Sequence, residues 1–529
     1  MSLSTDAPAP TPPPSERPAE RHRFLGAVMG LLSAAVAIAV AHLVAGFVSR
    51  EASPVIAVGS TAIDLTPEWL KSFAIRTFGS NDKTVLLIGI GVVLAIVAAV
   101  LGIASVRNRS VGLIGLTVFG LLGMVAAVTR PTGSAVDALP SLVGAVAGAG
   151  TLIFLHARLP QEHADDARPS PAIGVERRRF LLGGLAAVGT AFAAGAAGQF
   201  FARRFAADES RAALEIPKAM DVAAPAPAGA ELGVPGLSPF MTPNDEFYRV
   251  DTALIVPAVR AEDWTLRIHG MVDREITLNF EQLIARELIE RDITLTCVSN
   301  EVGGPYIGNA RWVGVPIKPL LEEAGVDPAA DQLVSRSVDG FTVGSPIAVV
   351  MDGRDAMLAV EMNGEPLPLE HGFPVRMVVP GLYGYVSATK WVTEMELTTF
   401  DAFDPYWIKR GWAEEAPIKT ESRIDTPKPF AKVAANGAVV AGVAWAQHVG
   451  IERVEVRVDE GPWREAELAA QDTIDTWRQW RFAWDDATSG NHSLQVRATD
   501  AGGGTQTAER VTPFPDGATG QHQIVVTVT

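Results

Sequence analysis

The sequence predicts three structural parts: an N-terminal bundle of about five transmembrane helices, an α+β domain, and a C-terminal immunoglobulin-like β-sandwich. Long Ala/Val/Leu/Gly runs nearly free of charge fill about the first 200 residues, which is typical of membrane spans. Mixed strand and helix patterns broken by Gly and Pro follow, and regularly spaced alternating runs end the chain. We place the parts as follows: a disordered cytosolic tail at 1–20, a transmembrane region at 21–203, a linker at 204–240, the α+β domain at 241–420 and the sandwich at 421–529.

Five apolar stretches are each long enough to cross about 30 Å of hydrocarbon as a helix. They lie near residues 24–48, 84–105, 110–129, 138–157 and 180–201. Residues 53–78 are also apolar, but Asp64, Pro67 and Lys71 are among the residues that interrupt them. We therefore expect an interfacial or loop helix in that stretch.

Arginines in alternate loops predict how the bundle is oriented, because positive charge stays on the cytosolic side. They are Arg17, Arg21 and Arg23 before the first span, Arg107 and Arg109 after the second, and Arg158, Arg168 and Arg177 to Arg179 after the fourth. All of these loops are cytosolic in a single arrangement of five spans. That arrangement places everything after about residue 203 on the extracytoplasmic side of the cell membrane.

The last of these loops contains a second pattern. Glu176–Leu182 reads Arg-Arg-x-Phe-Leu before an Ala/Gly-rich apolar helix, which resembles a twin-arginine export signal. That pathway exports proteins already folded around a cofactor. Three arginines that simply anchor a helix at the cytosolic face would produce the same pattern, so both interpretations stay open.

Charge and cysteine content exclude some classes of protein. The net charge of −16 argues against nucleic acid as a partner, because phosphate contacts need a basic face. A chain with one cysteine has no intramolecular disulfide, so Cys297 is either a buried bystander or a thiolate with a chemical role.

Alternating patterns locate the elements after the linker. Trp264–His269 is typical of a strand, and Phe280–Leu288 of a short helix. Strand patterns of the sandwich recur at 439–445, 454–458, 480–484, 494–498 and 524–528. Without a cysteine pair, the sandwich core must depend on Val and Trp packing.

The residues around Cys297 form the densest cluster of unusual types. A predicted strand at 293–296 delivers the cysteine to its end, where a loop with Asn300 and two glycines begins. Strand ends are common places for functional sites, and a thiolate suits a soft metal. Free cysteines are also common in ordinary cores, so position alone leaves both interpretations open.

Three sequence blocks resemble the sulfite oxidase family. Thr296–Asn300 and Gly308–Trp312 are similar to its cysteine loop and the Arg-Trp element that follows. The block from Glu361 to Arg376, which continues through Gly381 to Thr389-Lys390-Trp391, is long and specific. The resemblance covers roughly residues 240–420 and implies a sulfite-oxidase-type molybdopterin domain. The sandwich that follows resembles the family's dimerisation domain.

The resemblance implies a molybdenum–molybdopterin cofactor, with Cys297 as the protein's metal ligand and molybdopterin supplying the other sulfurs. The phosphate of molybdopterin needs fixed cationic and amide donors. The implied cofactor-binding residues are Phe247, Tyr248, Arg249, Asp251, Asp339, His371, Arg376, Thr389 and Lys390, and the implied catalytic residues are Cys297, Arg249 and Arg311. Each has an ordinary alternative, since Arg and Lys usually lie at surfaces and Asp339-Gly340 is a good turn sequence.

The sequence departs from the family in the substrate pocket. Sulfite oxidases carry arginines after the cysteine loop, whereas this chain has Glu301 and Val302. A carboxylate facing a dianion would repel it by several kcal/mol in a dry site. The family's pocket tyrosine is replaced by tryptophan within Trp407–Trp412.

We therefore expect a membrane-anchored oxidoreductase that transfers an oxygen atom to or from a small sulfur or similar oxide substrate. A sulfoxide-type reductase of the same fold is the alternative among enzymes, and a non-catalytic anchored interaction protein is the alternative of another class. The expected partners are a separate electron carrier (a cytochrome or a quinone-linked protein), the membrane, and a second copy of the chain bound through the sandwich.

Overall fold

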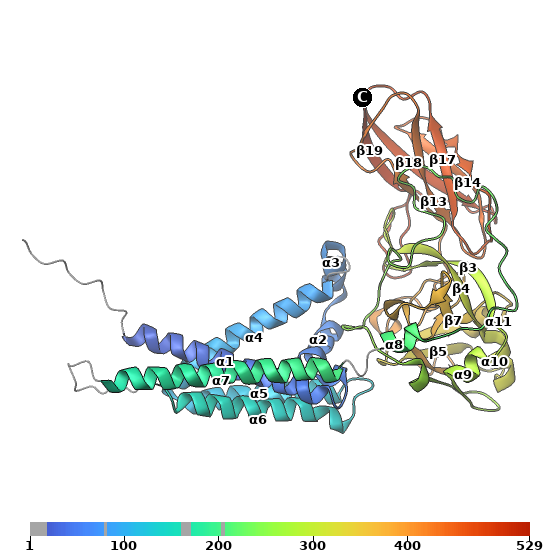
Figure 1. Ribbon diagram of the computed structural model, residues 1–529. Helices are drawn as coiled ribbons and strands as arrows, with labels where there is room; N and C mark the ends of the chain where they lie inside the picture. The colour runs from blue at the N-terminus through green and yellow to red at the C-terminus, as the bar shows by residue number, and fades with distance from the viewer. Residues whose placement is uncertain (1–17, 79–81, 160–170, 203–206) are drawn as a thin grey trace, which may run out of the picture. The chain divides into compact units, whose positions relative to one another are not determined.

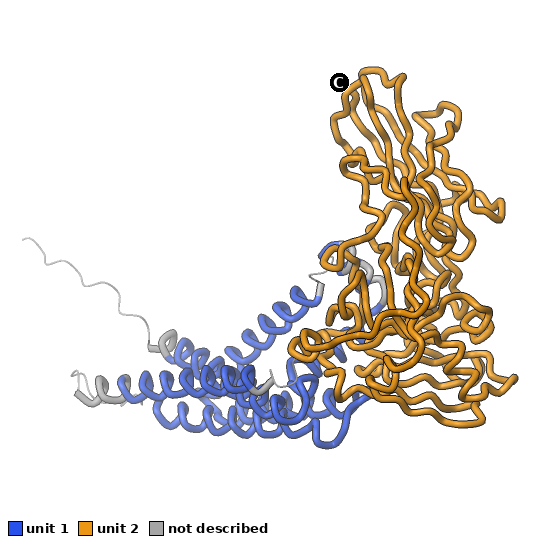
Figure 2. Tube along the Cα trace, turned by 45° about the vertical axis from the view of Figure 1, so that its right-hand side comes forward, with its two compact units in different colours: residues 1–204 blue, residues 205–529 orange. Residues whose placement is uncertain are grey.

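A computed structural model describes residues 18–78, 82–159, 171–202 and 207–529 (Figure 1). The chain divides into two compact units, residues 1–204 and residues 205–529 (Figure 2). We describe each unit by itself. The expected tail at 1–20 lies almost wholly outside the described residues.

Unit 1 consists of helices. They are α1 (Pro18–Ala45), α2 (Pro54–Leu65), α3 (Glu68–Phe78), α4 (Asp82–Arg107), α5 (Arg109–Val128), α6 (Leu139–His156) and α7 (Pro171–Ala202). Within the described ranges, five helical segments are long and apolar enough to cross a membrane, and they match the five expected spans. Residues 53–78 form α2 and α3 instead of a further span, and Pro67 lies at the break between them because proline cannot continue a helix.

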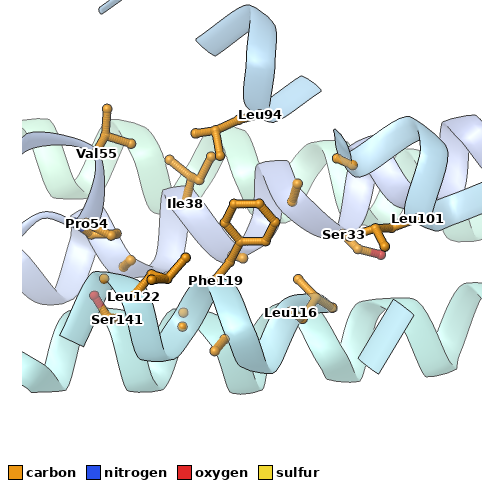
Figure 3. Close-up of a pocket in the computed structure, with 18 of the residues that line it drawn as sticks. Ser33, Ile38, Pro54, Val55, Leu94, Leu101, Leu116, Phe119, Leu122 and Ser141 are labelled. Carbon is orange, nitrogen blue, oxygen red and sulfur yellow. The ribbon is translucent and has the colours of Figure 1, made fainter. Parts of the chain in front are cut away.

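Small residues bring the helices of unit 1 together. A Cβ atom at Gly30 of α1 would collide with the backbone of Ala98 on α4, and one at Gly144 of α6 would collide with Ala37 of α1. Such close contacts between small residues are typical of helices that associate in a membrane. An apolar crevice lies among α1, α2, α4, α5 and α6, and Ile38, Leu94 and Phe119 line it (Figure 3).

The first half of unit 2 contains two sheets. The first has the order β2-β1-β10-β5-β6 and is formed by β1 (Thr265–Gly270), β2 (Ile276–Asn279), β5 (Gln332–Ser337), β6 (Thr342–Pro346) and β10 (Val392–Thr398). The strands of the second are β3 (Ile289–Thr296), β4 (Ile307–Pro316), β7 (Met357–Met362) and β8 (Glu365–Pro366), with β9 (Arg376–Val378) paired to β7. The short helices are α8 (Asp208–Ala212), α9 (Phe280–Ile284), α10 (Ile317–Ala324) and α11 (Ile347–Met351).

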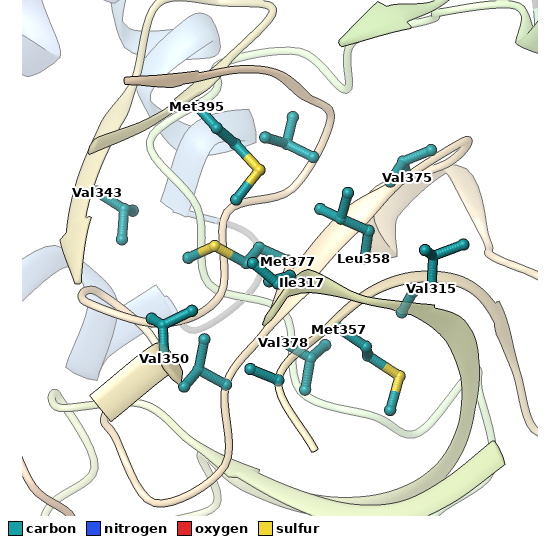
Figure 4. Close-up of a cluster of buried hydrophobic side chains, with 14 of the residues drawn as sticks. Val315, Ile317, Val343, Val350, Met357, Leu358, Val375, Met377, Val378 and Met395 are labelled. Atoms are coloured by element: carbon teal, nitrogen blue, oxygen red, sulfur yellow. The ribbon is translucent and has the colours of Figure 1, made fainter. Parts of the chain in front are cut away.

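One hydrophobic core joins both sheets (Figure 4). Met357 and Leu358 of β7, Met377 of β9 and Met395 of β10 are fully buried in it. The helix expected over 280–288 ends at Ile284, because residues 289–296 pair with β4 as β3. This core fixes the ends of β3, β4 and β9, where the candidate site lies.

The second half of unit 2 consists of two sheets that share a core of Val, Ile, Trp and Phe side chains. One has the order β11-β13-β17-β16 and the other β12-β19-β18-β14-β15. Their strands are β11 (Glu421–Thr426), β12 (Lys432–Val433), β13 (Ala438–Trp445), β14 (Ile451–Val458), β15 (Arg464–Glu465), β16 (Glu467–Leu468), β17 (Arg478–Trp484), β18 (Gly490–Asp500) and β19 (Gln523–Val528). The five expected strand patterns fall on β13, β14, β17, β18 and β19.

The segment expected to be a linker packs along unit 2 instead. Ala207, Ala230 and Phe240 are buried. The Leu232 backbone N–H donates to the Gln479 side chain at 2.7 Å. Side chains of both halves of unit 2 accept from or donate to the backbone of this Ala/Pro/Gly-rich segment, so the linker is held against unit 2.

Candidate functional site

The cysteine loop begins where β3 ends. The Cys297 backbone N–H donates to the Tyr306 carbonyl at 3.0 Å, and the Asn300 N–H donates to the Cys297 carbonyl at 3.0 Å. The Asn300 side-chain oxygen accepts the Tyr306 N–H at 2.8 Å, which closes the loop. The half-buried Cys297 is thus held by backbone bonds on both sides.

Polar groups surround the Cys297 thiol. Burial raises the pKa of the thiol, whereas hydrogen bonds from Ser299 and the positive charge of Lys390 act in the opposite direction. The Cys297 charge also raises the pKa values of Tyr248 and Tyr383, although burial is the larger cause for both. Both phenols therefore remain protonated near the thiol.

Arg376 at the start of β9 is the most unusual charged residue of the site. It is 5% exposed, and its guanidinium carbon lies 5.1 Å from the Trp312 ring centroid. One guanidinium nitrogen donates to the His371 carbonyl at 3.2 Å, but Nε has no partner among the described residues. Burial lowers the pKa of Arg376 to about 10, so the side chain is still a cation at neutral pH.

A second buried cation lies beside it. Lys390 Nζ donates to Asp251 at 2.8 Å and to the Glu370 carbonyl at 3.0 Å. Arg249 Nε donates to the same Asp251 oxygen at 2.9 Å. Burial lowers the pKa of Lys390 to about 8, because it outweighs the attraction of Asp251.

His371 and two aromatic residues line the same region. His371 Nε2 lies 3.0 Å from the Asn244 carbonyl, which only accepts, so we assign the proton to Nε2 and leave Nδ1 as an acceptor. Burial and the charges of Arg376 and Lys390 lower the pKa of His371 to about 3, so it is neutral. The Phe247 ring stacks on Tyr248 at 5.2 Å and contacts His371 edge-on at 5.6 Å.

Arg311, an expected catalytic residue, does not join this group. It forms a bidentate pair with Asp292, with both N–O distances at 2.7 Å. The guanidinium of Arg376 lies over the ring of Trp312, which follows Arg311 on β4. Successive side chains of a strand point to opposite faces of the sheet. Arg311 therefore lies on the other face of the sheet, as a structural ion pair.

Two expected cofactor contacts are engaged elsewhere. The Thr389 hydroxyl is fully buried and lies 2.5 Å from that of Ser335. Asp339 accepts the Phe341 N–H at 3.1 Å and closes the turn between β5 and β6. Beside that turn, the Val338 N–H donates to the Trp391 carbonyl at 2.9 Å.

Three residues near the thiol were missed from the sequence: Ser299, Tyr306 and Tyr383. Ser299 is within the cysteine loop itself, and loop position alone would have identified it. Tyr306 lies 6.4 Å from Tyr248 between ring centroids. Tyr383 belongs to the block between Gly381 and Thr389, and nothing in its local sequence shows that it is near the cysteine.

The arrangement fits a ligand that combines a soft metal with a phosphate. Arg376, Lys390 and Arg249 are three cations, and Asp251 is the acid that pairs with two of them. Buried Arg376 Nε lacks an acceptor within the described part of the chain. Buried charges are normally paired, so an anion such as a phosphate would fit in this region beside the Cys297 thiol.

Comparisons with known proteins identify the same region. Residues 253–407 match the model of the oxidoreductase molybdopterin binding domain. The chain is 29% identical over 291 residues to the mitochondrial sulfite oxidase of Drosophila melanogaster, covering 46% of this chain and 50% of that protein. It is also 29% identical to the sulfite oxidase of Gallus gallus, covering 62% of that protein. The chain thus spans half to two thirds of the length of these sulfite oxidases.

This chain covers a larger share of a bacterial relative than of the sulfite oxidases. The uncharacterized oxidoreductase YuiH of Bacillus subtilis is 33% identical over 149 residues, which is 28% of this chain and 72% of that protein. Among solved structures, the sulfane dehydrogenase SoxCD of Paracoccus pantotrophus aligns with a TM-score of 0.48 and 24% identity, covering 55% of this chain and 83% of that chain. The match to the family model and the similarity to YuiH confirm the resemblance found in the sequence. The chain belongs to the sulfite oxidase family of molybdopterin oxidoreductases.

Proposed function

We propose that this protein is a membrane-anchored oxidoreductase that transfers an oxygen atom to or from a small sulfur oxide or similar substrate. The observation that carries the proposal is the thiol of Cys297 beside a buried group of cations that exceeds its acidic partners. An ordinary core cysteine would be surrounded by apolar side chains. A non-catalytic anchored protein gives no reason to bury Arg376 without an acidic partner.

The residues fall into distinct roles in this proposal. Cys297 would bind the metal, and Arg376 and Lys390 would hold the pterin phosphate. Neutral His371, Tyr248 and Arg249 would complete the residues that hold the cofactor. The cofactor, when bound, supplies a metal centre that accepts or donates two electrons during oxygen-atom transfer.

The pocket supports a substrate that carries less negative charge than sulfite. Glu301 occupies the cysteine loop four residues after Cys297, where sulfite oxidases carry an arginine. Arg249 is already paired with Asp251, and Arg311 lies on the opposite face of the sheet. These contacts favour a neutral sulfoxide or a related oxide, with sulfite as the alternative substrate.

The surroundings of the domain complete the proposal. Five apolar helices in unit 1 are consistent with membrane spans. We infer from the arginine-rich loops that unit 2 lies outside the cytoplasm and that the twin-arginine pathway exports it already loaded. The immunoglobulin-like sandwich would pair two copies, and a separate cytochrome or quinone-linked carrier would exchange electrons.

Turnover in both directions tests the proposal. Purified full-length protein is assayed for sulfite oxidation with ferricyanide and for sulfoxide reduction with reduced methyl viologen. We expect oxygen-atom transfer on one of these small sulfur oxides, with sulfoxide reduction as the alternative direction. Protein that contains the cofactor but turns over neither class of substrate would contradict the proposed function.

The export part has its own test. Arg177→Lys combined with Arg178→Lys keeps the positive charge, so simple anchoring of α7 survives, whereas twin-arginine recognition is lost. We expect the catalytic domain to become inaccessible to external protease. A loaded and accessible domain in this variant would support simple anchoring.

A further inference from the structure

The cysteine loop reverses direction between Glu301 and Gly304. The Gly304 N–H donates to the Glu301 carbonyl at 2.7 Å, and Gly303 at the third position of this turn has φ +79°. A positive φ at the third position, and not at the second, is typical of a type II turn and favours glycine there. The turn follows Cys297 closely in the chain, so a contact that holds the turn also holds the loop of the proposed metal ligand.

Arg423 of β11 reaches this turn from the sandwich half of unit 2. Its Nη1 donates to the Gly304 carbonyl at 2.8 Å, and its Nε donates to Asp425 at 2.6 Å. The side chains of Arg423 and Asp425 are 10% and 5% exposed, so the two charges compensate each other away from water. A hydrogen bond from a charged donor is roughly twice as strong as a neutral one, and Asp425 fixes the direction of the guanidinium.

The same ion pair holds a second part of the chain. Arg423 Nη2 donates to the Ser238 hydroxyl at 3.0 Å, and Asp425 Oδ2 accepts the Ser238 N–H at 3.1 Å. A short stretch of chain leads from Ser238 to Asn244, whose carbonyl lies 3.0 Å from His371 Nε2. One ion pair of the sandwich therefore contacts both the cysteine loop and the segment that leads to the expected cofactor residues.

His522, directly before β19, lies against the same turn. A Cβ atom at Gly303 would lie 2.4 Å from His522 Nε2, so the imidazole packs on the Gly303 backbone itself. His522 Nδ1 accepts the Ile424 N–H at 3.0 Å, which anchors the ring to β11 between Arg423 and Asp425. Gly303 is thus required both for its positive φ and for the space that the ring occupies.

Other contacts from the sandwich hold the strand before the cysteine. Gln447 Nε2 donates to the Thr296 hydroxyl at 2.8 Å, and the Trp477 N–H donates to the Thr294 hydroxyl at 2.8 Å. All four residues are buried. The strand β3 therefore stays in place without Arg423 or His522, and these two residues act on the turn.

We propose that Arg423 and His522 are positioning residues of the Cys297 site, which hold the Glu301–Gly304 turn in one conformation from the sandwich. The inference rests on the proposed oxidoreductase function and deepens it. It gives the sandwich a role beyond the pairing of two copies, because the turn begins at Glu301, the residue proposed to disfavour a dianionic substrate. Both residues act through the backbone of the turn.

The single cysteine of the chain makes the loop directly measurable. In cofactor-free full-length protein, dithionitrobenzoate labels only Cys297. The thiol is half-buried, so the labelling rate reports how often the loop opens. Arg423→Gln is combined with Asp425→Asn, so that no buried charge is left unpaired. We expect this neutral-pair variant to label roughly 10- to 100-fold faster, the scale of a lost hydrogen bond from a charged group.

Arg478 of β17 provides the matched control. It donates to the Ala469 carbonyl at 2.7 Å and to the Ile451 carbonyl at 2.9 Å, and neither acceptor belongs to the cysteine loop. Arg478→Gln removes comparable bonds within the sandwich and should leave the labelling rate within about twofold of the native rate. Arg423→Lys keeps a charged donor for Gly304 and should restore most of the slow labelling.

Loaded full-length protein gives a second measurement. Hydrogen exchange of residues 297–306 should become faster in the neutral-pair variant and stay unchanged in Arg478→Gln. Because the turn carries Glu301, the ratio of kcat/KM for dimethyl sulfoxide to kcat/KM for sulfite should fall roughly three- to tenfold in the neutral-pair variant. A purely structural role of the ion pair would lower both values equally.

Equal labelling and exchange of the loop in the neutral-pair variant and in Arg478→Gln would overturn the proposal. If the neutral-pair variant does not fold, Gly303→Ala tests the same turn, because the added methyl group meets His522. It should also speed labelling, and a native rate in that variant would count against the proposal. A loop that opens as predicted in a protein that turns over no substrate contradicts the proposed function and leaves the hold on the turn supported.

Discussion

Arg376 and Arg311 belong to the same sheet, yet their surroundings differ. Two nitrogens of the Arg311 guanidinium, Nε and Nη2, donate to the carboxylate of Asp292, which is itself buried. Arg376 is more deeply buried and has no carboxylate partner among the described residues. Arg311 is paired with a carboxylate of the chain itself, and we propose that Arg376 pairs with an anion from outside it.

We propose that this difference separates structural charges from ligand-binding charges, which the sequence alone does not do. Both arginines follow motifs of the same family, and both were expected to take part in the site. A buried charge that is already paired within the fold contributes to folding. A buried charge without a partner in the chain needs a ligand of opposite charge. The predictions below test this distinction, beginning with the largest effect.

Cys297→Ser removes the thiolate from the ligand-binding face and changes little else in volume. We expect turnover to fall roughly 10³-fold or more, the scale seen when one member of a catalytic unit is lost. Fold and bound pterin should persist, because Arg376 and Lys390 are untouched. Circular dichroism, pterin fluorescence and steady-state rates check this, and full activity in the serine variant would refute Cys297 as the metal ligand.

The paired substitutions Arg376→Gln and Arg311→Gln compare the two faces directly. Arg376→Gln should lose most of the bound pterin while the thermal stability of cofactor-free protein stays the same or rises, since a buried unpaired charge is removed. Arg311→Gln should keep the pterin but destabilise the fold by roughly 1–3 kcal/mol, because Asp292 is left buried without its partner. Pterin content and denaturant unfolding distinguish the two.

The opposite pattern would break the comparison. If Arg311→Gln empties the site and Arg376→Gln only destabilises the fold, then burial and pairing do not identify the cofactor face. Lys318→Gln, at a lysine of α10, controls for the loss of a positive charge as such.

Glu421 should make the stability of the fold depend on pH, and we expect this effect to be smaller than those of the substitutions above. Its folded pKa of about 8 lies above the value of 4.5 for an unperturbed Glu, so between these pH values the native state binds more protons than the unfolded state. Stability from this group is therefore fully present below about pH 4.5 and is lost as pH rises through about 8. Glu421→Gln should flatten that decline in a plot of melting temperature against pH, and Glu415→Gln should not.

The smallest expected effect concerns substrate choice. Glu301→Arg should lower KM for sulfite roughly three- to tenfold, or about 1 kcal/mol for partly screened charges, with little change in kcat. The rate should also become more sensitive to salt. Efficient sulfite oxidation by the native protein would contradict our interpretation of the pocket.

Sequence reasoning succeeded where the signal is local or periodic. The five apolar segments follow from length and hydrophobicity, and the strands of the sandwich from alternation. The packing of residues 207–240, within the segment expected to be a linker, comes from hydrogen bonds to residues such as Gln479, which lies far along the chain. No local pattern reports such contacts.

The same limit explains which parts of the site were foreseen. Cys297, Arg376 and Lys390 stand in specific motifs, so their proximity was predictable from the family. The motif does not show which face of β4 Arg311 occupies or that Asp292 pairs with it, so its separation from Arg376 required the structure. The burial of Glu421 opposite Trp445 depends on the pairing of β11 with β13, which required the structure.

Molybdenum and pterin content of the purified full-length protein tests the central claim most directly. Protein produced in a host that makes the cofactor is measured by elemental analysis and by fluorescence of the oxidised pterin. We predict both in amounts equimolar with the chain, and with Arg376→Gln we predict a large loss of both. Folded native protein that contains neither molybdenum nor pterin would contradict the account.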